Sequence, residues 1–213
     1  MLRSGSLDST LSKRSNKAAL AARVAASPAV CAQVLDGLSA PKASVKFGCA
    51  KVLQMVSEDN PRALYPNFAR FVALLQNDNK LLQWTAIRVI ANLARVDSKA
   101  KVERILDRYF APIRGPVMIT AANIIKGSAA IAAAKPHLTR RIIKQLLGVE
   151  KARYRTDECR NVALGHAIDA FDAFFRQIEA RKPVLEFVRR QLANTRRATR
   201  RKAERFLKKH EQP

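Results

Sequence analysis

One segment of the sequence combines residue types that could perform covalent chemistry: Cys159, His166, Asp169 and Asp172. A thiolate beside an imidazole is an activated nucleophile, and a carboxylate can orient the imidazole. Cys159 and His166 are seven residues apart, which places them on one helix face but about 10 Å apart along its axis. That separation is too long for a thiolate–imidazole pair. We therefore interpret Cys159 and His166 as structural residues and the two aspartates as surface charges.

The sequence carries no other pattern typical of an active site or a metal site. His137 and His210 have no potential ligands clustered around them. There is no HExxH, no Cys/His set with metal-binding spacing, no GxSxG and no phosphate-binding glycine loop. We predict that the protein is not an enzyme, has no catalytic residues and binds neither a cofactor nor a metal.

Positive charge is the clearest chemical signal. The chain has 40 Lys and Arg against 17 Asp and Glu, a net charge of +23. At about 100° per residue, the C-terminal helical segment has one narrow face made of Thr199, Ala203, Phe206 and Leu207. The rest of that segment carries Arg197, Arg200, Arg201, Lys202, Arg205, Lys208 and Lys209. The nearly uniform sign favours contact with an anionic partner; the alternative is a solvated basic surface that only ends the fold.

Trp84, the single tryptophan, is a second candidate contact. In a helix it lies opposite the apolar face of Leu82, Ile90 and Leu93, with Arg88 one turn later. An indole beside a guanidinium could stack a base or anchor a protein partner. The alternative is that Trp84 fills a groove between two helices.

Helices must position these residues. The chain has only 7 Gly, and four prolines follow Ser27, Asn60, Lys135 and Lys182, each before an apolar periodic segment. Proline at the first helical position loses no hydrogen bond, and Ser27, Asn60 or Thr156 can cap free amides. No strand-like alternation is present, and residues 1–15 are interpreted as a disordered, basic, Ser-rich tail.

The cysteines and the hydropathy pattern indicate in which compartment the protein is expected. Cys31, Cys49 and Cys159 are an odd, widely spaced set, which predicts a reducing compartment rather than a disulfide framework. The longest apolar stretches are interrupted by Arg23 and Pro28, so no membrane span is expected. We expect a cytoplasmic protein and a monomer.

The helices repeat. The segments VKFGCAKVLQMV, LLQWTAIRVIANLA, PVMITAANIIKGSA and CRNVALGHAIDAF superpose with a small residue in common: Cys49, Ala86, Ala121 and Ala163. The second helices then align at Phe71-Val72, Ile105-Leu106, Ile142-Ile143 and Phe187-Val188. A period near 40 with two helices per unit predicts stacked helical hairpins. The expected core is Cys49, Val52, Leu53, Phe71, Val72, Ala86, Ile90, Leu93, Ile105, Leu106, Ala121, Ile125, Ile142, Ile143, Ala163 and Phe174.

These segments resemble HEAT repeats of the armadillo-type superfamily, over roughly residues 43–209. The resemblance implies an all-α, right-handed α-solenoid of about four to five helical hairpins in one domain, residues 16–209. The expected helix pairs are roughly 16–38, 43–76, 79–110, 116–148 and 156–193, with a terminal helix at 195–209. Most such solenoids present a concave surface to a partner, so the resemblance also implies a scaffold.

In HEAT-like stacks the second helices usually line that concave surface. The alignment places Arg70, Arg104 and Arg141 in one column, Lys144 and Arg189 with Asp107 in a second, and Arg108 and Arg190 in a third. Such columns would form a basic ladder able to follow a phosphate backbone or an acidic segment. The alternative is that they face solvent and pair with neighbours such as Glu103 or Asp107.

The function predicted from these features is a non-catalytic scaffold that recognises a macromolecule through its basic surfaces. An acidic protein and a nucleic acid both remain open as the partner, and no small-molecule substrate is expected. The third alternative is a HEAT-like alkylpurine DNA glycosylase, whose resemblance implies aromatic residues around a lesion beside a catalytic aspartate. Here Trp84 is followed one turn later by Arg88, and only Tyr65, Tyr109 and Tyr154 could supplement it.

Overall fold

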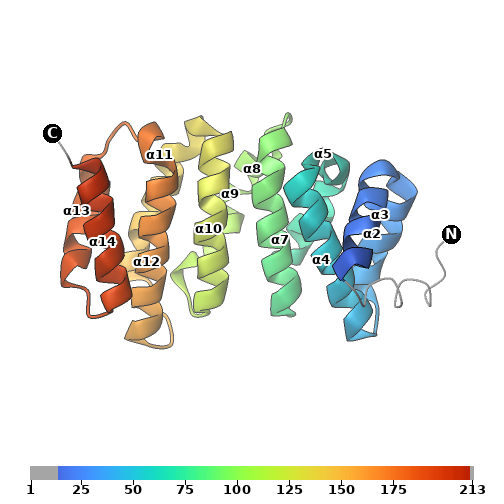
Figure 1. Cartoon of the computed structure of the whole chain (residues 1–213), viewed down its shortest axis with the longest axis horizontal. Helices are drawn as coiled ribbons and strands as arrows, with labels where there is room; N and C mark the ends of the chain where they lie inside the picture. Colours follow the sequence, from blue (N-terminus) through green and yellow to red (C-terminus); the bar gives the residue numbers. More distant parts are fainter. Residues whose placement is uncertain (1–13, 212–213) are drawn as a thin grey trace. The chain divides into compact units, whose positions relative to one another are not determined.

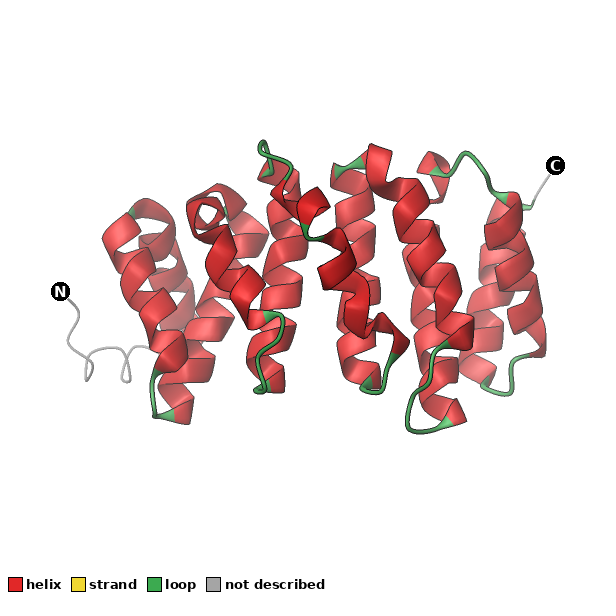
Figure 2. Cartoon of the chain, turned by 180° about the vertical axis from the view of Figure 1, so that it is seen from behind, coloured by secondary structure: helices red, strands yellow, loops and turns green. Residues whose placement is uncertain are grey.

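The computed structural model describes residues 14–211, and every regular element in that range is helical (Figures 1 and 2). The predicted tail, residues 1–15, lies outside the described residues except for its last two, with which the first described helix begins. Chain contacts divide the protein into two compact units, one ending at Val102 and the other beginning at Glu103. The single domain expected from the sequence therefore stays a prediction.

The first unit contains the first three of the expected helix pairs, the third of them only in part. Its helices are α2 (Arg14–Ala26), α3 (Pro28–Asp36), α4 (Ala43–Asp59), α5 (Pro61–Leu64), α6 (Phe68–Leu74) and α7 (Lys80–Leu93). The long helices α2, α4 and α7 pack next to one another in sequence order, and α3, α5 and α6 form a second layer beside them. The short helix α8 (Lys101–Arg104) spans the boundary between the units.

The second unit repeats this arrangement. Its helices are α9 (Leu106–Phe110), α10 (Met118–Ala134), α11 (Thr139–Leu147), α12 (Asp157–Phe174), α13 (Lys182–Arg190) and α14 (Arg197–His210). The long helices α10, α12 and α14 stand side by side, with α11 and α13 in contact in the other layer (Figure 1). Short 3₁₀ turns connect many of the helices in both units.

Local sequence signals explain several helix starts. Ser27 accepts a hydrogen bond from the Val30 amide and is followed by Pro28, and Thr156 accepts one from the Cys159 amide. Both caps were predicted and are confirmed. Asn60, however, makes no side-chain cap, although Pro61 begins α5 as expected. Asn79, which was not singled out, caps α7 by accepting from the amides of residues 81 and 82.

The column of small residues lies in the core of both units. Cys49, Ala86, Ala121 and Ala163 each have a relative exposure of 0%. A small side chain at this position lets neighbouring long helices approach closely, which a large one would prevent. The register of the repeat predicted from the sequence is therefore confirmed at these positions.

Three residues of the expected core are only half-buried: Val72, Ile105 and Ile143. Val72 and Ile143 directly follow the fully buried Phe71 and Ile142 on short helices, and a step of about 100° turns them from the buried face. Ile105 separates α8 from α9 with a non-helical backbone (φ −103°, ψ 6°). The other thirteen residues of the expected core are buried.

One close approach positions α14 against α12. Gly165 is buried, and a Cβ atom there would lie 2.9 Å from the Thr199 hydroxyl. That hydroxyl donates a hydrogen bond of 2.8 Å to the carbonyl of Asn161. The absence of a side chain at Gly165 is therefore what allows this contact between the two helices.

Candidate functional site

The cations of the predicted ladder all lie exposed on the short second helices. They are Arg70 on α6, Arg104 on α8, Arg108 on α9, Arg141 and Lys144 on α11, and Arg189 and Arg190 on α13. Arg70 belongs to the first unit and the others to the second.

Two of these arginines are held by carboxylates of the preceding repeat. Arg70 donates to Asp36 at 2.9 Å, and Arg141 donates to both oxygens of Asp107 at 3.2 Å. In each case the aspartate precedes the arginine by 34 residues. For Arg141 this is the pairing that the alternative interpretation of the columns anticipated. The pairing of Arg70 with Asp36 was not anticipated, and the equal spacing in the sequence was the signal that could have indicated it.

Arg190 is held more firmly. Its guanidinium donates to both oxygens of Glu150 at 3.0 and 2.8 Å, and Gln191 donates to the same carboxylate at 3.0 Å. The hydrogen bonds between Arg190 and Glu150 raise the pKa of Arg190 above its ordinary value. Its neighbour Arg189 pairs with Glu211 at 2.5 Å. An anionic ligand at these positions would have to displace a carboxylate that is already bound.

The terminal helix α14 has the face that the sequence predicted. Thr199, Ala203, Phe206 and Leu207 are its buried residues. Phe206 packs edge-on against Phe175, with ring centroids 5.1 Å apart. The apolar face thus fixes α14 to its neighbours and directs the other residues outward.

Three of the seven predicted cations of α14 have partners within the fold. Lys202 donates to Asp169 at 2.5 Å, and Lys209 donates to Asp172 at 2.9 Å. Arg200 donates to the backbone carbonyls of residues 194 and 195. These side chains attach α14 to α12 and to the preceding turn, so their charge is partly used inside the protein.

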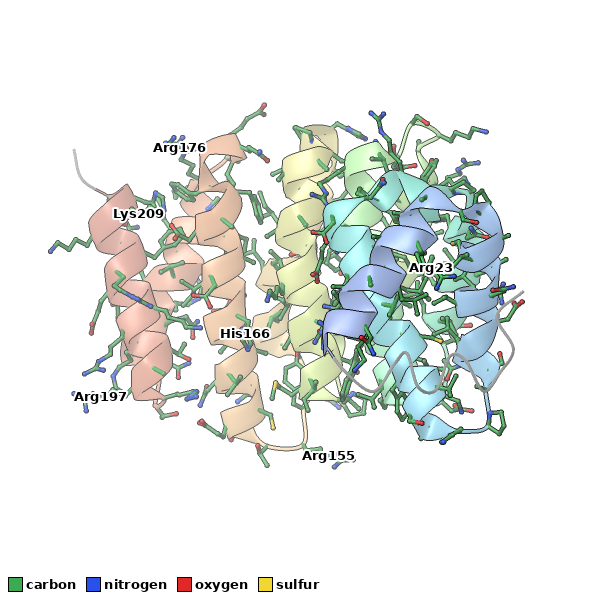
Figure 3. All side chains as sticks on the ribbon, turned by 45° about the vertical axis from the view of Figure 1, so that its right-hand side comes forward. Arg23, Arg155, His166, Arg176, Arg197 and Lys209 are labelled. Carbon is green, nitrogen blue, oxygen red and sulfur yellow. The ribbon has the colours of Figure 1, made fainter. Side chains whose placement is uncertain are left out.

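The remaining four, Arg197, Arg201, Arg205 and Lys208, form what we call the basic stripe. All four are exposed, and within residues 14–211 none has a carboxylate oxygen within 4.0 Å. Their spacing of four, four and three residues places them within about 80° of one another on the helix. The stripe extends about 16 Å along the axis, opposite the buried face. Figure 3 shows Arg197 at the beginning of α14 and Lys209 near its other end.

Trp84 is half-buried and lies on α7 where α7 packs against α4. It lines a groove of about 150 Å³ together with Phe47, Ala50, Lys51, Gln54, Leu81, Thr85 and Arg88. Arg88 donates to the amide oxygen of Gln54 at 3.3 Å across this groove. Both interpretations of Trp84 therefore hold in part. Some of its side chain fills the space between α4 and α7, and the rest is exposed along the groove.

The enzyme-like group does not assemble. Cys159 and His166 are half-buried on α12, and no hydrogen bond joins them in the described part of the chain. Burial, and then the positive charge of Lys202, lower the pKa of His166. Asp169 and Asp172 bind Lys202 and Lys209 instead. Their role in the structure is to hold α14.

The other histidines and the tyrosines also have structural partners. His210 lies 2.6 Å from Asp172, and His137 lies 3.2 Å from Glu103. Tyr65 donates to Asp97 at 2.6 Å, and Tyr154 donates to the Ile113 carbonyl at 2.5 Å. Burial raises the pKa of Tyr154 to about 12. Tyr109 is completely buried.

Two features are absent from the described residues: a cluster of metal ligands and a membrane-spanning helix. Within residues 14–211, no group of three or more His, Cys, Asp or Glu residues is arranged to hold a metal ion. Over the same range, no helix is both long enough and apolar enough to span a membrane.

Comparison with known proteins identifies the fold. No protein-family model matches the chain, and no curated protein does. Among solved structures, the chain is similar to an engineered protein (TM-score 0.52, 16% identity, covering 95% of this chain and 94% of that one). It is also similar to a designed armadillo repeat protein (TM-score 0.53, 14% identity, covering 95% and 97%). The chain has an armadillo/HEAT-like helical-repeat fold, and the fold resemblance predicted from the sequence is confirmed.

Proposed function

We propose that this chain is a non-catalytic binding scaffold that holds the phosphate backbone of a nucleic acid on the basic stripe of α14. A helical-repeat fold supports a binding role in general. The observation that carries the proposal is the basic stripe itself: four exposed cations on one helix face, without carboxylate partners among residues 14–211. A guanidinium group binds phosphate oxygens through two parallel hydrogen bonds, and three of the four cations are arginines.

The surroundings of the stripe favour a nucleic acid over a protein. The centre of a protein–protein interface is apolar, whereas interfaces with nucleic acids are polar and positively charged. The exposed large apolar side chains among residues 14–211 are Leu81, Ile119 and Leu192, and none of them lies on α14. A phosphate backbone needs no apolar contact, so the stripe suits it better.

The predicted ladder has a secondary role in this proposal. Arg70, Arg141 and Arg190 contact carboxylates, and a phosphate would have to replace those partners. Lys144 is exposed and has no carboxylate within 4.0 Å among the described residues, so it can add to the binding surface directly. We expect weak sequence discrimination, because contacts to phosphates carry no base information.

Two features support the absence of catalysis. The residue one turn after Trp84 is Arg88 rather than a carboxylate, which departs from the pattern implied for a glycosylase. Tyr65 and Tyr154 are engaged by Asp97 and a backbone carbonyl, and buried Tyr109 is inaccessible to a lesion. A reducing compartment such as the cytoplasm is part of this proposal, because Cys31, Cys49 and Cys159 are free thiols.

The test is the salt dependence of binding to a short DNA duplex, measured by fluorescence anisotropy. Each phosphate neutralised adds about 0.9 to the slope of log affinity against log salt. A variant with Arg197, Arg201, Arg205 and Lys208 all changed to Gln should flatten that slope by about three to four. The matched control changes Arg23, Arg62, Arg176 and Lys151 to Gln. These four residues are exposed on other elements, and their loss should flatten the slope by less than about one.

Equal flattening by the two variants would overturn the proposal, because binding would then follow total charge rather than the stripe. An affinity of the unchanged protein that is independent of salt would overturn it as well. In that second case an acidic protein partner becomes the better candidate, and the same two variants can be compared in a pull-down from the source cell.

A further inference from the structure

The groove between α4 and α7 is lined by one face of each of these neighbouring helices. Phe47, Ala50, Lys51 and Gln54 line it from α4, and Leu81, Trp84, Thr85 and Arg88 line it from α7. Each residue of the α7 set lies 34 residues after one residue of the α4 set, three fewer than the 37 residues between Cys49 and Ala86. Both sets have the i, i+3, i+4, i+7 spacing of one helix face. The two helices therefore each turn one face towards the same groove.

The apolar residues of the groove are left open to solvent. Leu81 is 48% exposed, one of the three large apolar side chains that are exposed among residues 14–211. Phe47 and Trp84 beside it are half-buried. Aromatic residues of this kind, partly covered and next to an exposed leucine, are typical of the anchor points of protein interfaces.

The size of the groove limits what it can hold. Its volume is about 150 Å³, the size of cavity that holds one benzene-sized group. Sites for small-molecule ligands are usually about 300 Å³ or larger. One aromatic or branched aliphatic side chain of a partner fits the groove, and a whole cofactor does not.

The charges of the groove have one sign. Lys51 and Arg88 are the charged residues that line it, and both are exposed. Each lies one helical turn after an aromatic residue, Phe47 on α4 and Trp84 on α7. The carboxylate of Glu58 reaches the edge of the groove only through Gln54, whose amide donates to it at 2.9 Å. The groove thus complements an apolar group with negative charges on both sides.

We propose that the groove between α4 and α7 binds an acidic peptide segment of a protein partner. One large apolar side chain of the segment inserts against Phe47, Leu81 and Trp84, and flanking carboxylates contact Lys51 and Arg88. This site lies in the first unit and does not depend on the proposed function of α14. It differs from the basic stripe because it contains the apolar anchor that a protein interface requires.

Trp84 is the single tryptophan of the chain, so intrinsic fluorescence of the full-length protein reports on this groove directly. The probe is a short synthetic peptide without tryptophan, with one central phenylalanine between runs of glutamate. We expect a saturable change in Trp84 emission. Replacing the central phenylalanine by alanine should weaken binding about tenfold or more, because an apolar side chain is no longer buried.

Variants of exposed residues test the site without disturbing the core. Leu81→Glu should weaken peptide binding about tenfold or more, and an acidic residue in the first turn of α7 is compatible with the helix dipole. Its matched control is Ile119→Glu, because Ile119 is equally exposed at 48% and lies in the second unit. Lys51→Glu should also weaken binding, whereas Lys126→Glu on α10, also exposed, should leave it within about twofold.

The outcomes separate this proposal from the one for α14. Peptide binding should be unchanged when the four residues of the basic stripe are changed to Gln. Equal binding of the phenylalanine and alanine peptides would overturn the proposal, and so would loss of binding in the stripe variant. Quenching of Trp84 by a thymidine oligonucleotide without any response to the peptide would also overturn it, in favour of base stacking on the indole.

Discussion

The second helices and α14 both carry many cations, but the two sets differ in how many form ion pairs within the protein. Arg70, Arg141 and Arg190 on second helices contact a carboxylate that belongs to the preceding repeat. The basic stripe on α14 has no such carboxylate among the described residues. The two surfaces look alike in composition, and their capacity to bind an anion is set by what the neighbouring repeat supplies. A net charge of +23 therefore says little about where a ligand binds.

In the second unit, the second helices and α14 are both held by the packing of the long helices, and Ala121→Asp disrupts that packing. Ala121 is fully buried on α10, so the new carboxylate would be placed in a dry interface. We expect the free energy of unfolding to fall by about 3 kcal/mol or more, measured by urea denaturation with circular dichroism. Ala133→Asp, at an exposed position of the same helix, is the control and should cost less than about 1 kcal/mol.

A smaller change tests how α14 alone is held. A methyl group at Gly165 would lie 2.9 Å from the Thr199 hydroxyl, so Gly165→Ala should displace α14 and cost about 1–2 kcal/mol. At Gly148 a Cβ atom would have no neighbour within 4 Å, and Gly148→Ala should be neutral or slightly stabilising. Equal stability of the two variants would show that the contact between α12 and α14 is looser than described.

The paired arginines can be converted into a surface like the stripe. Changing Asp36 and Asp107 to Asn and Glu150 to Gln removes the partners of three arginines. We expect duplex DNA to bind about tenfold more tightly at low salt, with a slope steeper by up to about 2.7.

The control for this triple variant has the same net charge. It changes Asp59 and Asp78 to Asn and Glu179 to Gln, three exposed acidic residues that take part in none of the ion pairs described above. Only a small gain in affinity is expected there. If both triple variants gain equally, carboxylate pairing is not what distinguishes the second helices from α14.

The smallest expected effect concerns pH. Partial burial raises the pKa of Asp172, but hydrogen bonds from Lys209 and His210 outweigh it and lower the pKa below 3.8. The ionised form is thus favoured by folding, and its contribution is present above pH 3.8 and lost as the pH falls further. For this partly exposed group we expect less than about 1 kcal/mol. Asp172→Asn should lower the melting temperature at pH 5, and the difference should shrink towards pH 2; a constant difference would contradict this.

The repeat could be predicted because its signals are local. The small residues Cys49, Ala86, Ala121 and Ala163 recur at intervals of 37, 35 and 42 residues, and each is fully buried. The half-burial of Val72 and Ile143 was not predicted, because an apolar side chain can lie either at the centre of the buried face of a helix or at the edge of that face. The break at Ile105 has no proline or glycine to mark it.

The state of the candidate site depended on tertiary contacts. The sequence places Arg70 and Arg141 at the same position of two repeats. Their ion pairs with Asp36 and Asp107 are not evident from that position, because each pair joins side chains of two successive repeats. Such pairs become visible only when acids and bases are compared at the repeat spacing. For α14 the helix angle alone separated the buried face from the cations, because a single helix contains all of that information.

Several polar contacts between successive repeats share one interval in the sequence, and this bears on how such a chain can change its length. Asp36–Arg70, Gln54–Arg88, Asp107–Arg141 and Asn161–Thr195 are each separated by 34 residues. Each pair joins two successive repeats, so duplication of both repeats together would copy the pair intact and leave neither charge without its partner. Insertion of a single residue within a repeat would rotate one partner by about 100° and break the contact. Gene lineages of this architecture should therefore gain and lose whole repeats more readily than single residues inside them.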